Sequence, residues 1–215
     1  MRYLGKVGRP KEHNEKTAAA LLDAAESIVA TEGLDALSVR RVAERAGTTT
    51  RAVYSVFDSR EGMLVALGTR AFEILGAWVA EAPSTDDPTA DLVEAGAGQF
   101  RRWTLEHPAL FRVAFPSTQI PPALAERFGP VRLNALVGLV DFVGRALELQ
   151  GTLADPEIRD ATLTFHAMCE GLALLELRGV LMPHRAEQVW REALTALVTG
   201  MRTRQPVAAD QGRRF

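Results

Sequence analysis

The chain has 215 residues, of which 47% are hydrophobic and 24% charged, a composition typical of a soluble globular protein with one or two domains. Its first sixteen residues contain no apolar run of signal-peptide length, and nowhere do about 18 apolar residues follow one another. No membrane association is therefore expected, and the expected location is cytoplasmic. Cys169 is the only cysteine, which excludes a disulfide framework and a cysteine-rich zinc site.

The net charge of -2 is unevenly distributed along the chain. Residues 1–60 carry ten Lys or Arg against eight Asp or Glu, whereas residues 61–215 carry fifteen against nineteen. All three lysines, together with Arg2 and Arg9, lie within the first sixteen residues. A basic module on an acidic body is expected of a DNA-binding protein, because neutralisation of phosphates drives affinity. A solvated basic tail gives the same pattern, so charge alone leaves both interpretations open.

In the first third of the chain, the spacing of apolar residues predicts four helices. The first runs from near Asn14 or Thr17 to Glu32, and Gly33 follows its end. Ser38 is expected to cap the second helix, and Gly47 to form a turn with positive φ after it. Thr49 is expected to cap a short third helix that ends at Phe57. Asp58 and Glu61 have the spacing of a capping box and begin the fourth helix.

The remaining two thirds are also predicted to be helical. Residues 83–91 are expected to form a loop, and helices are expected at residues 92–106, 109–115, 124–149, 156–181 and 184–204, with prolines and Gly151 at the breaks. No alternation of apolar and polar residues is long enough for a sheet, and no solenoid repeat is present. The predicted fold is all-α.

Residues 37–64 predict a helix-turn-helix, in which the second of two short helices enters the major groove of DNA. That helix opens with Thr49, Thr50 and Arg51. We expect Arg51 to bind a guanine, because its guanidinium matches O6 and N7, and the threonine hydroxyls to reach phosphates or bases. Tyr54 either donates its phenol to a phosphate or seals the small core, whereas Val53 and Phe57 fall on the packed side.

Three further polar residues, Ser38, Arg40 and Arg60, are placed at helix starts, where main-chain N–H groups and the helix dipole favour phosphate. For Arg40 and its neighbour Arg41, a solvated helix face is an equally open interpretation.

Residues 17–67 resemble the N-terminal domain of the TetR/AcrR family of transcriptional regulators, through LLDAAESIVATEGLDALSVRRVAERAG, TTTRAVYSVF and DSREGML. The resemblance implies a homodimeric repressor that binds a palindromic operator on double-stranded DNA and is released by a small-molecule effector. It also implies DNA contacts from Ser38, Arg40, Thr49, Thr50, Arg51, Tyr54, Ser55 and Arg60. Val56 replaces the His or Tyr usual before the phenylalanine, so that phosphate contact is expected to be missing.

On this basis the chain divides into a flexible basic arm (1–13), a three-helix helix-turn-helix domain (14–60), a helical bundle for ligand binding and dimerisation (61–205) and a disordered tail (206–215). GRPK at residues 8–11 resembles a minor-groove arm, and the alternative is a mobile tail whose charge adds only slightly to affinity.

The C-terminal part resembles a TetR-like class named for a Trp-His-Gly motif, through RRWTLEHPALFRVAF (101–115) and FHAMCEGLALLELRGVL (165–181), although only Gly171 of the motif is kept. In the family the last two long helices pair with their copies as a four-helix dimer interface. Residues offering apolar surface for that role are Leu172, Leu175, Val189, Leu194, Leu197 and Val198.

Candidates for an effector cavity lie on the C-terminal helices, although any one of these aromatic side chains can also be plain core. They are Trp103, Phe111, Phe115, Phe142, Phe165, His166, Met168, Cys169 and Glu170. The Glu170 carboxylate needs a partner among apolar residues, either Arg102, Arg112 or Arg145, or an effector.

His166, Cys169 and Glu170 have the helical spacing of metal ligands. A bundle site also needs ligands from facing helices, and no such motif appears, so neither a metal nor a cofactor is expected. The sequence has no G-x-S-x-G and no phosphate-binding glycine loop, and an enzyme is therefore not expected. A DNA-binding protein or activator that responds to no effector is the alternative function.

Overall fold

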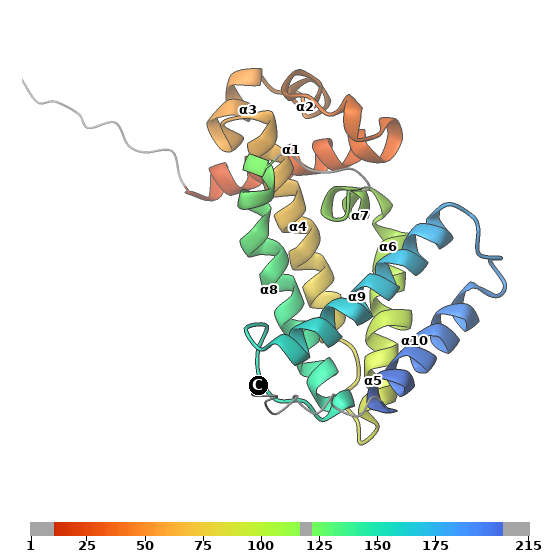
Figure 1. Cartoon of the computed structure of the whole chain (residues 1–215). Helices are drawn as coiled ribbons and strands as arrows, with labels where there is room; N and C mark the ends of the chain where they lie inside the picture. The colour runs from red at the N-terminus through yellow and green to blue at the C-terminus, as the bar shows by residue number, and fades with distance from the viewer. Residues whose placement is uncertain (1–10, 117–121, 204–215) are drawn as a thin grey trace, which may run out of the picture. The chain divides into compact units, whose positions relative to one another are not determined.

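The computed structural model describes residues 11–116 and 122–203. Every regular element in these two ranges is helical, which confirms the predicted all-α fold (Figure 1). The chain forms two compact units: an N-terminal unit of Met1–Ile74 and His107–Arg132, and a C-terminal unit of Leu75–Glu106 and Leu133–Phe215. The N-terminal unit thus includes more of the chain than the predicted domain of residues 14–60.

The N-terminal unit contains α1 (Lys11–Glu32), the short 3₁₀ helix η1 (Leu34–Ala36), α2 (Val39–Arg45), α3 (Thr50–Phe57), the first part of α4 (Arg60–Ala80) and α7 (Pro108–Ala114). α2 and α3 lie beside each other, and both α2 and α7 lie against α1 (Figure 1). Its core consists of residues at most 1% exposed, among them Leu21, Ile28, Val42, Val53, Met63 and Leu67. Burial of each such side chain stabilises the unit by about 1.5–3 kcal/mol.

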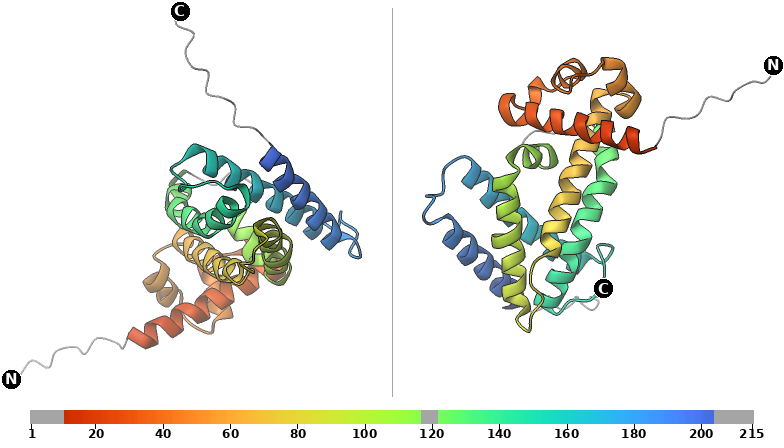
Figure 2. Two further views of the ribbon diagram at one scale, coloured as in Figure 1. Left: turned by 90° about the horizontal axis from the view of Figure 1, so that it is seen from below. Right: turned by 180° about the vertical axis from the view of Figure 1, so that it is seen from behind.

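The C-terminal unit contains α5 (Pro88–Glu94), η2 (Ala95–Phe100), α6 (Arg101–Glu106), most of α8 (Pro122–Leu147), α9 (Pro156–Leu177) and α10 (Ala186–Thr203). α5, η2 and α6 follow one another without a break, and η2 is π-helical. α9 and α10 run antiparallel beside each other (Figures 1 and 2). Leu92, Trp103, Val143, Phe165, Trp190 and Leu194 are at most 1% exposed and form the core.

Several boundaries differ from those predicted. α1 begins at Lys11, so the last residues of the predicted arm are helical, whereas residues 1–10 and the predicted tail lie outside the described residues. α4 is capped by Ser59, whose Oγ accepts from the Gly62 N–H at 2.9 Å; the predicted cap Asp58 instead ends α3 with φ 60°. α5 takes up the second half of the predicted loop, because Asp87 caps it and accepts from the Ala90 N–H at 3.0 Å.

By length and composition alone α4 is apolar enough to cross a membrane, with a mean hydropathy of 1.4 over its most apolar window. A core helix of a soluble protein passes the same test. Met63, Leu67 and Ala71 of α4 are completely buried, and Arg70 in its middle forms an ion pair with Asp23 of α1. These contacts are those of a core helix.

Candidate nucleic-acid interface

The turn between α2 and α3 depends on Gly47, which has φ 63°. This left-handed conformation strains residues that carry a Cβ, so glycine is the residue suited to it. The Gly47 N–H donates to the Glu44 carbonyl at 3.2 Å, and the Thr48 N–H donates to the Ala43 carbonyl at 2.9 Å, which together end α2. The side chain of Thr49 then accepts from the Ala52 N–H at 3.3 Å and starts α3. The predicted helix-turn-helix geometry is confirmed.

α3 has one buried and one exposed face. Val53 and Phe57 are 0% and 7% exposed and pack inside the unit. Thr50, Arg51, Tyr54 and Ser55 are all exposed, and Tyr54 is 52% exposed. Of the two interpretations of Tyr54, exposure favours a phenol free to reach a phosphate over a ring that seals the core. The Ser55 hydroxyl donates to the Ala52 carbonyl at 3.0 Å, and its oxygen can still accept a hydrogen bond.

Ser38 and Arg40 lie at the beginning of α2. The Ser38 Oγ accepts from the Arg41 N–H at 3.4 Å and so caps α2 as predicted. The side chain of Arg40 is 84% exposed and pairs with Glu44 one turn further on at 2.8 Å. Such an exposed pair contributes little to stability, so the Arg40 guanidinium can exchange it for a phosphate.

The side chain of Arg60 is partly buried and contacts the main chain of its own unit. Its Nε–H donates to the Leu37 carbonyl at 2.8 Å and its Nη2 to the Leu34 carbonyl at 3.4 Å. The guanidinium therefore ties the start of α4 to the connection between α1 and α2, and the phosphate contact expected for this residue stays a prediction. The sequence could not indicate this, because the acceptors are 23 and 26 residues away.

Sequence reasoning also missed a set of contacts between α1 and α2. Arg41 and Arg45 of α2 both form ion pairs with Glu32 at the end of α1, and Arg45 also donates to the Ser27 hydroxyl at 2.7 Å. These contacts hold the first helix of the motif against α1. Arg41 is thus paired with a carboxylate of its own unit and is not a free solvated side chain.

The candidate effector residues fall in both compact units. Trp103, Phe165 and Cys169 are at most 2% exposed in the C-terminal unit, and Phe142 is half-buried. Burial raises the pKa of the Cys169 thiol, which keeps it protonated. Phe111 belongs to the N-terminal unit with Phe115, whose ring also meets Phe72 edge-on at 5.5 Å, and Met168 is 36% exposed.

Phe100, which sequence reasoning missed, joins several of these rings. Its centroid lies 6.1 Å from both Trp103 and His166 and 6.3 Å from Trp190. His166 Nε2 in turn lies 3.5 Å from a carboxylate oxygen of Glu170, one helical turn further on. Arg145 instead pairs with Asp91 at 2.8 Å, and Arg102 lies over the Trp78 ring at 5.0 Å.

Two buried polar atoms on the same helical stretch, Gln99 Oε1 and Thr104 Oγ1, have no hydrogen-bond partner among the described residues. Buried polar atoms are nearly always hydrogen-bonded, and an exception calls for an explanation. No group of three or more His, Cys, Asp or Glu in the described ranges has the arrangement of a metal site.

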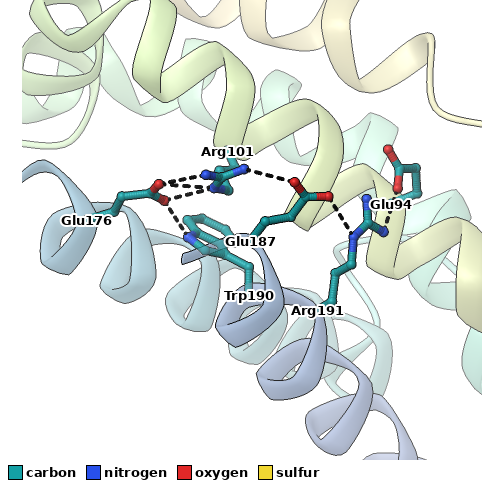
Figure 3. A network of polar contacts seen from close by, with 6 residues as sticks. All are labelled: Glu94, Arg101, Glu176, Glu187, Trp190 and Arg191. Atoms are coloured by element: carbon teal, nitrogen blue, oxygen red, sulfur yellow. Dashed lines mark hydrogen bonds and ion pairs between the residues drawn. The ribbon is translucent and has the colours of Figure 1, made fainter. Parts of the chain in front are cut away.

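A polar network connects three parts of the C-terminal unit (Figure 3). Arg101 of α6 donates two hydrogen bonds to the Glu176 carboxylate of α9, from Nη2 at 2.8 Å and from Nε at 2.9 Å. The Trp190 Nε1–H of α10 donates to the same carboxylate at 2.8 Å. Arg191 of α10 donates to Glu94 of α5 at 2.8 Å, and Glu187 lies between the two arginines. The network fixes α9 and α10 against the α5–α6 stretch.

An all-helical protein with a glycine turn between two short capped helices, and with the outer face of the second one polar and exposed, has the architecture of a helix-turn-helix DNA-binding regulator. Residues 21–67 match the family model "Bacterial regulatory proteins, tetR family", and residues 93–197 match "Tetracyclin repressor-like, C-terminal domain". The chain belongs to the TetR family. It is accordingly a DNA-binding transcriptional regulator and not an enzyme.

Several solved structures have a similar fold. The TetR family regulator PfmR from Thermus thermophilus is 22% identical, with 83% of this chain and 97% of that chain covered and a TM-score of 0.61. A tetR-family transcriptional regulator from Streptomyces coelicolor is 20% identical, with 87% and 79% covered and a TM-score of 0.63. RolR in complex with resorcinol is 20% identical, with 91% and 97% covered and a TM-score of 0.55.

The search of the curated proteins found no match. The resemblance of the C-terminal part to the Trp-His-Gly class stays a prediction, since the matching model is the tetracyclin repressor-like one.

Proposed function

We propose that the chain is a homodimeric repressor that leaves a palindromic operator when a small molecule binds to its C-terminal unit. The exposed face of α3 supports the DNA-binding part of the proposal. It presents Thr50, Arg51, Tyr54 and Ser55 together, from a helix whose opposite face is anchored in the core. In a dimer, two such helices meet successive major grooves about 34–36 Å apart.

The outer face of α9 supports dimerisation. Leu163, Met168 and Leu175 are 44%, 36% and 39% exposed, and nothing lies within 4 Å of a Cβ added at Gly171 between them. An exposed apolar stripe with a small residue at its centre suits close packing against a second helix. Of the six residues expected to form this interface, Leu172, Leu194 and Val198 are buried within the subunit instead.

The partnerless atoms of Gln99 and Thr104 support effector binding in the C-terminal unit. They lie on the stretch that also carries Trp103 and Phe100, so polar and aromatic groups occur together there. Such a combination suits a small ring with a hydrogen-bonding group. RolR, which has the same fold, was solved with resorcinol, a molecule of this chemistry.

A footprint of the DNA upstream of the chain's own gene tests the proposal, repeated with resorcinol and other small phenols. Two symmetric protected half-sites, lost when a ligand is added, are the expected result. A symmetric footprint that no ligand alters would favour the alternative of an effector-independent DNA-binding protein.

Gly171→Glu tests the dimer separately, because the added side chain has room within the subunit but not in a packed interface. Sedimentation should then show a monomer with unchanged helix content. Gly138→Glu, at an exposed position of α8 that also has nothing within 4 Å, is the matched control and should stay dimeric. If the Gly171→Glu variant stays dimeric, α9 does not form the dimer interface.

A further inference from the structure

Two side chains of the C-terminal unit have polar atoms that are buried and unused by the protein itself. Thr104 of α6 is 1% exposed, and its Oγ1 has no hydrogen-bond partner among the described residues. The Oε1 of Gln99 in η2 is buried in the same way and also has no partner there. A buried polar atom left unpaired destabilises the fold. Both atoms therefore need a reason other than packing.

Another buried threonine of the same unit shows what a structural threonine does. Thr162 of α9 is 0% exposed, and its hydroxyl donates to the Ile158 carbonyl, four residues earlier, at 2.7 Å. The exposed Thr199 of α10 bonds in the same way at 2.8 Å. Thr104 makes no such bond, although Phe100 precedes it by four residues. The Thr104 hydroxyl is therefore directed away from the main chain of its own helix.

The two polar side chains share one face of the helical stretch with two aromatic rings. The residues of this face have the spacing i, i+1, i+4 and i+5, which places them on one side of a helix: Gln99, Phe100, Trp103 and Thr104. The centroids of the Phe100 and Trp103 rings lie 6.1 Å apart, and His166 of α9 meets the Phe100 ring edge-on. Aromatic rings beside a few polar groups are typical of a site for a small organic molecule.

The stretch that carries this face is held in place at two points. Arg101 donates to the Glu176 carboxylate at 2.8 and 2.9 Å (Figure 3). One turn earlier, a Cβ at Gly96 would lie 2.6 Å from Leu194 Cδ1 and 3.0 Å from Phe165 Cζ, so η2 packs closely against α9 and α10. The unused atoms are thus fixed in position before any ligand arrives, and a fixed site loses little freedom on binding.

The two unused groups together complement a single hydroxyl. The Thr104 hydroxyl can donate a hydrogen bond, and the Gln99 Oε1 can only accept one. A ligand oxygen that carries a hydrogen accepts from Thr104 and donates to Gln99 at the same time. An ether oxygen satisfies only Thr104 and leaves the Gln99 acceptor unpaired.

The charges of the stretch favour a neutral ligand. Arg101 is paired with Glu176, and both side chains are largely buried. The Arg102 guanidinium lies over the Trp78 ring at 5.0 Å. A charged ligand would have to separate one of these contacts or remain unpaired, and an unpaired charge in a buried site is costly.

We propose that Gln99 and Thr104 bind the hydroxyl group of a neutral aromatic ligand, with Thr104 donating to the hydroxyl oxygen and Gln99 Oε1 accepting its hydrogen. Phe100 and Trp103, on the same face, contact the ring of the ligand. The inference rests on the proposed effector binding in the C-terminal unit, and assigns to it the residues and the functional group through which the effector is recognised.

The first test needs no ligand. Thr104→Val keeps the shape of the side chain and removes only the unused hydroxyl, so the melting temperature of the full chain should stay the same or rise. Thr162→Val, the matched control at a buried position of α9, loses a hydrogen bond and should melt about 2–4 °C lower. If Thr104→Val melts as low as Thr162→Val, the Thr104 hydroxyl already has a partner, such as a bound water, and the proposal is overturned.

The second test is calorimetric titration of the full chain with resorcinol and phenol. Thr104→Val and Gln99→Met should each weaken resorcinol binding about tenfold, whereas Thr162→Val should bind as the wild type does. The wild type should bind 1,3-dimethoxybenzene, which has no O–H, more weakly than resorcinol, and should not bind 3,5-dihydroxybenzoate, which is charged at neutral pH. Wild-type affinity in both variants, or no binding of resorcinol and phenol by the wild type, would overturn the proposal.

The outcomes separate this inference from effector release. If a phenol abolishes the footprint while Thr104→Val and Gln99→Met keep their affinity, release stands and the assigned residues are wrong. If resorcinol binding depends on both residues but leaves the footprint unchanged, the site stands and release by this ligand is wrong.

Discussion

The Nε–H of Arg60 donates to the main-chain carbonyl of Leu37 at 2.8 Å, across 23 residues of sequence. The bond joins the first residue of α4 to the residue before the α2 cap, and the second donor of the same guanidinium reaches the Leu34 carbonyl. The start of α4 and the start of α2 are thereby held in one fixed relation. Arg60, which the sequence indicated only as a phosphate ligand, thus also links two helix starts within the unit.

Arg60→Leu should therefore lower the free energy of unfolding by about 1.5–3 kcal/mol, because two carbonyls lose a charged donor. Urea unfolding followed by circular dichroism measures the change. Arg51→Leu, at an exposed position without an ion pair in the described ranges, is the control and should leave stability within about 0.5 kcal/mol. Equal stability of the two variants would show that the Arg60 contacts contribute nothing.

Arg51→Ala should reduce discrimination between the operator and single-base variants of it by about 1–3 kcal/mol at one position in each half-site. The reason is that a bidentate contact to guanine is lost, while the buried face of α3 is untouched. Binding titrations on a panel of substituted duplexes give the discrimination at each position. If every position is discriminated as in the wild type, Arg51 does not contact a base.

Arg101→Met should destabilise the protein by about 3–5 kcal/mol, because it leaves the Glu176 carboxylate buried without its charged partner. The two side chains are 14% and 11% exposed, so solvent compensates little. Arg101→Met/Glu176→Leu removes both charges and should recover most of the loss. Urea unfolding of the two single variants and the double variant gives the coupling energy, and additive losses would contradict a direct interaction.

Acid should weaken the link between the 83–87 loop and α8 through Asp91, which is 1% exposed. Burial disfavours its charged form, but hydrogen bonds from the Thr85 N–H and hydroxyl and from Arg145 outweigh that and hold the pKa of the carboxyl below its ordinary value. A lowered folded-state pKa stabilises the protein above the unfolded value, about 3.9, and this stabilisation is lost as pH falls through the folded value.

Asp91→Asn should consequently be less stable than the wild type at pH 6, with a difference that shrinks toward pH 3. Thermal unfolding at the two pH values measures this difference. Asp86→Asn, at an exposed position of the same loop, should show little effect at either pH. If Asp91→Asn is less stable than the wild type by the same amount at pH 6 and at pH 3, the stabilising role of Asp91 does not depend on its ionisation.

Local signals explain why the helix-turn-helix was predictable from sequence. Gly47 takes its positive φ and Thr49 caps α3 through residues at most five positions apart, so short patterns contain the information. Arg60 donates to a carbonyl 23 residues away, and Arg101 donates to a carboxylate 75 residues away. No local sequence pattern encodes contacts over such separations. The same holds for Asp91, whose partner Arg145 is 54 residues distant.

The C-terminal candidates illustrate a second limit. Trp103, Phe111 and Phe165 are all large aromatic residues of predicted helices, and the sequence pattern makes them candidates for one cavity. In the structure Phe111 belongs to the N-terminal unit and the other two to the C-terminal unit. Apolar periodicity tells which face of a helix is buried but not which core buries it.

The π-helical segment η2 has a consequence for how this protein can change over evolutionary time. The Arg101 N–H donates to the Gly96 carbonyl five positions earlier, so η2 holds more residues per turn than an α-helix. Because a π-helical turn takes up about one residue more than an α-helical turn, loss of one codon within residues 95–100 would restore an α-helical turn and leave Arg101 facing Glu176. The same loss within the regular helix α9, ahead of Glu176, would instead rotate that residue by about 100° and break the contact. A one-residue gap between related sequences is therefore expected to be tolerated at residues 95–100 and not within α9.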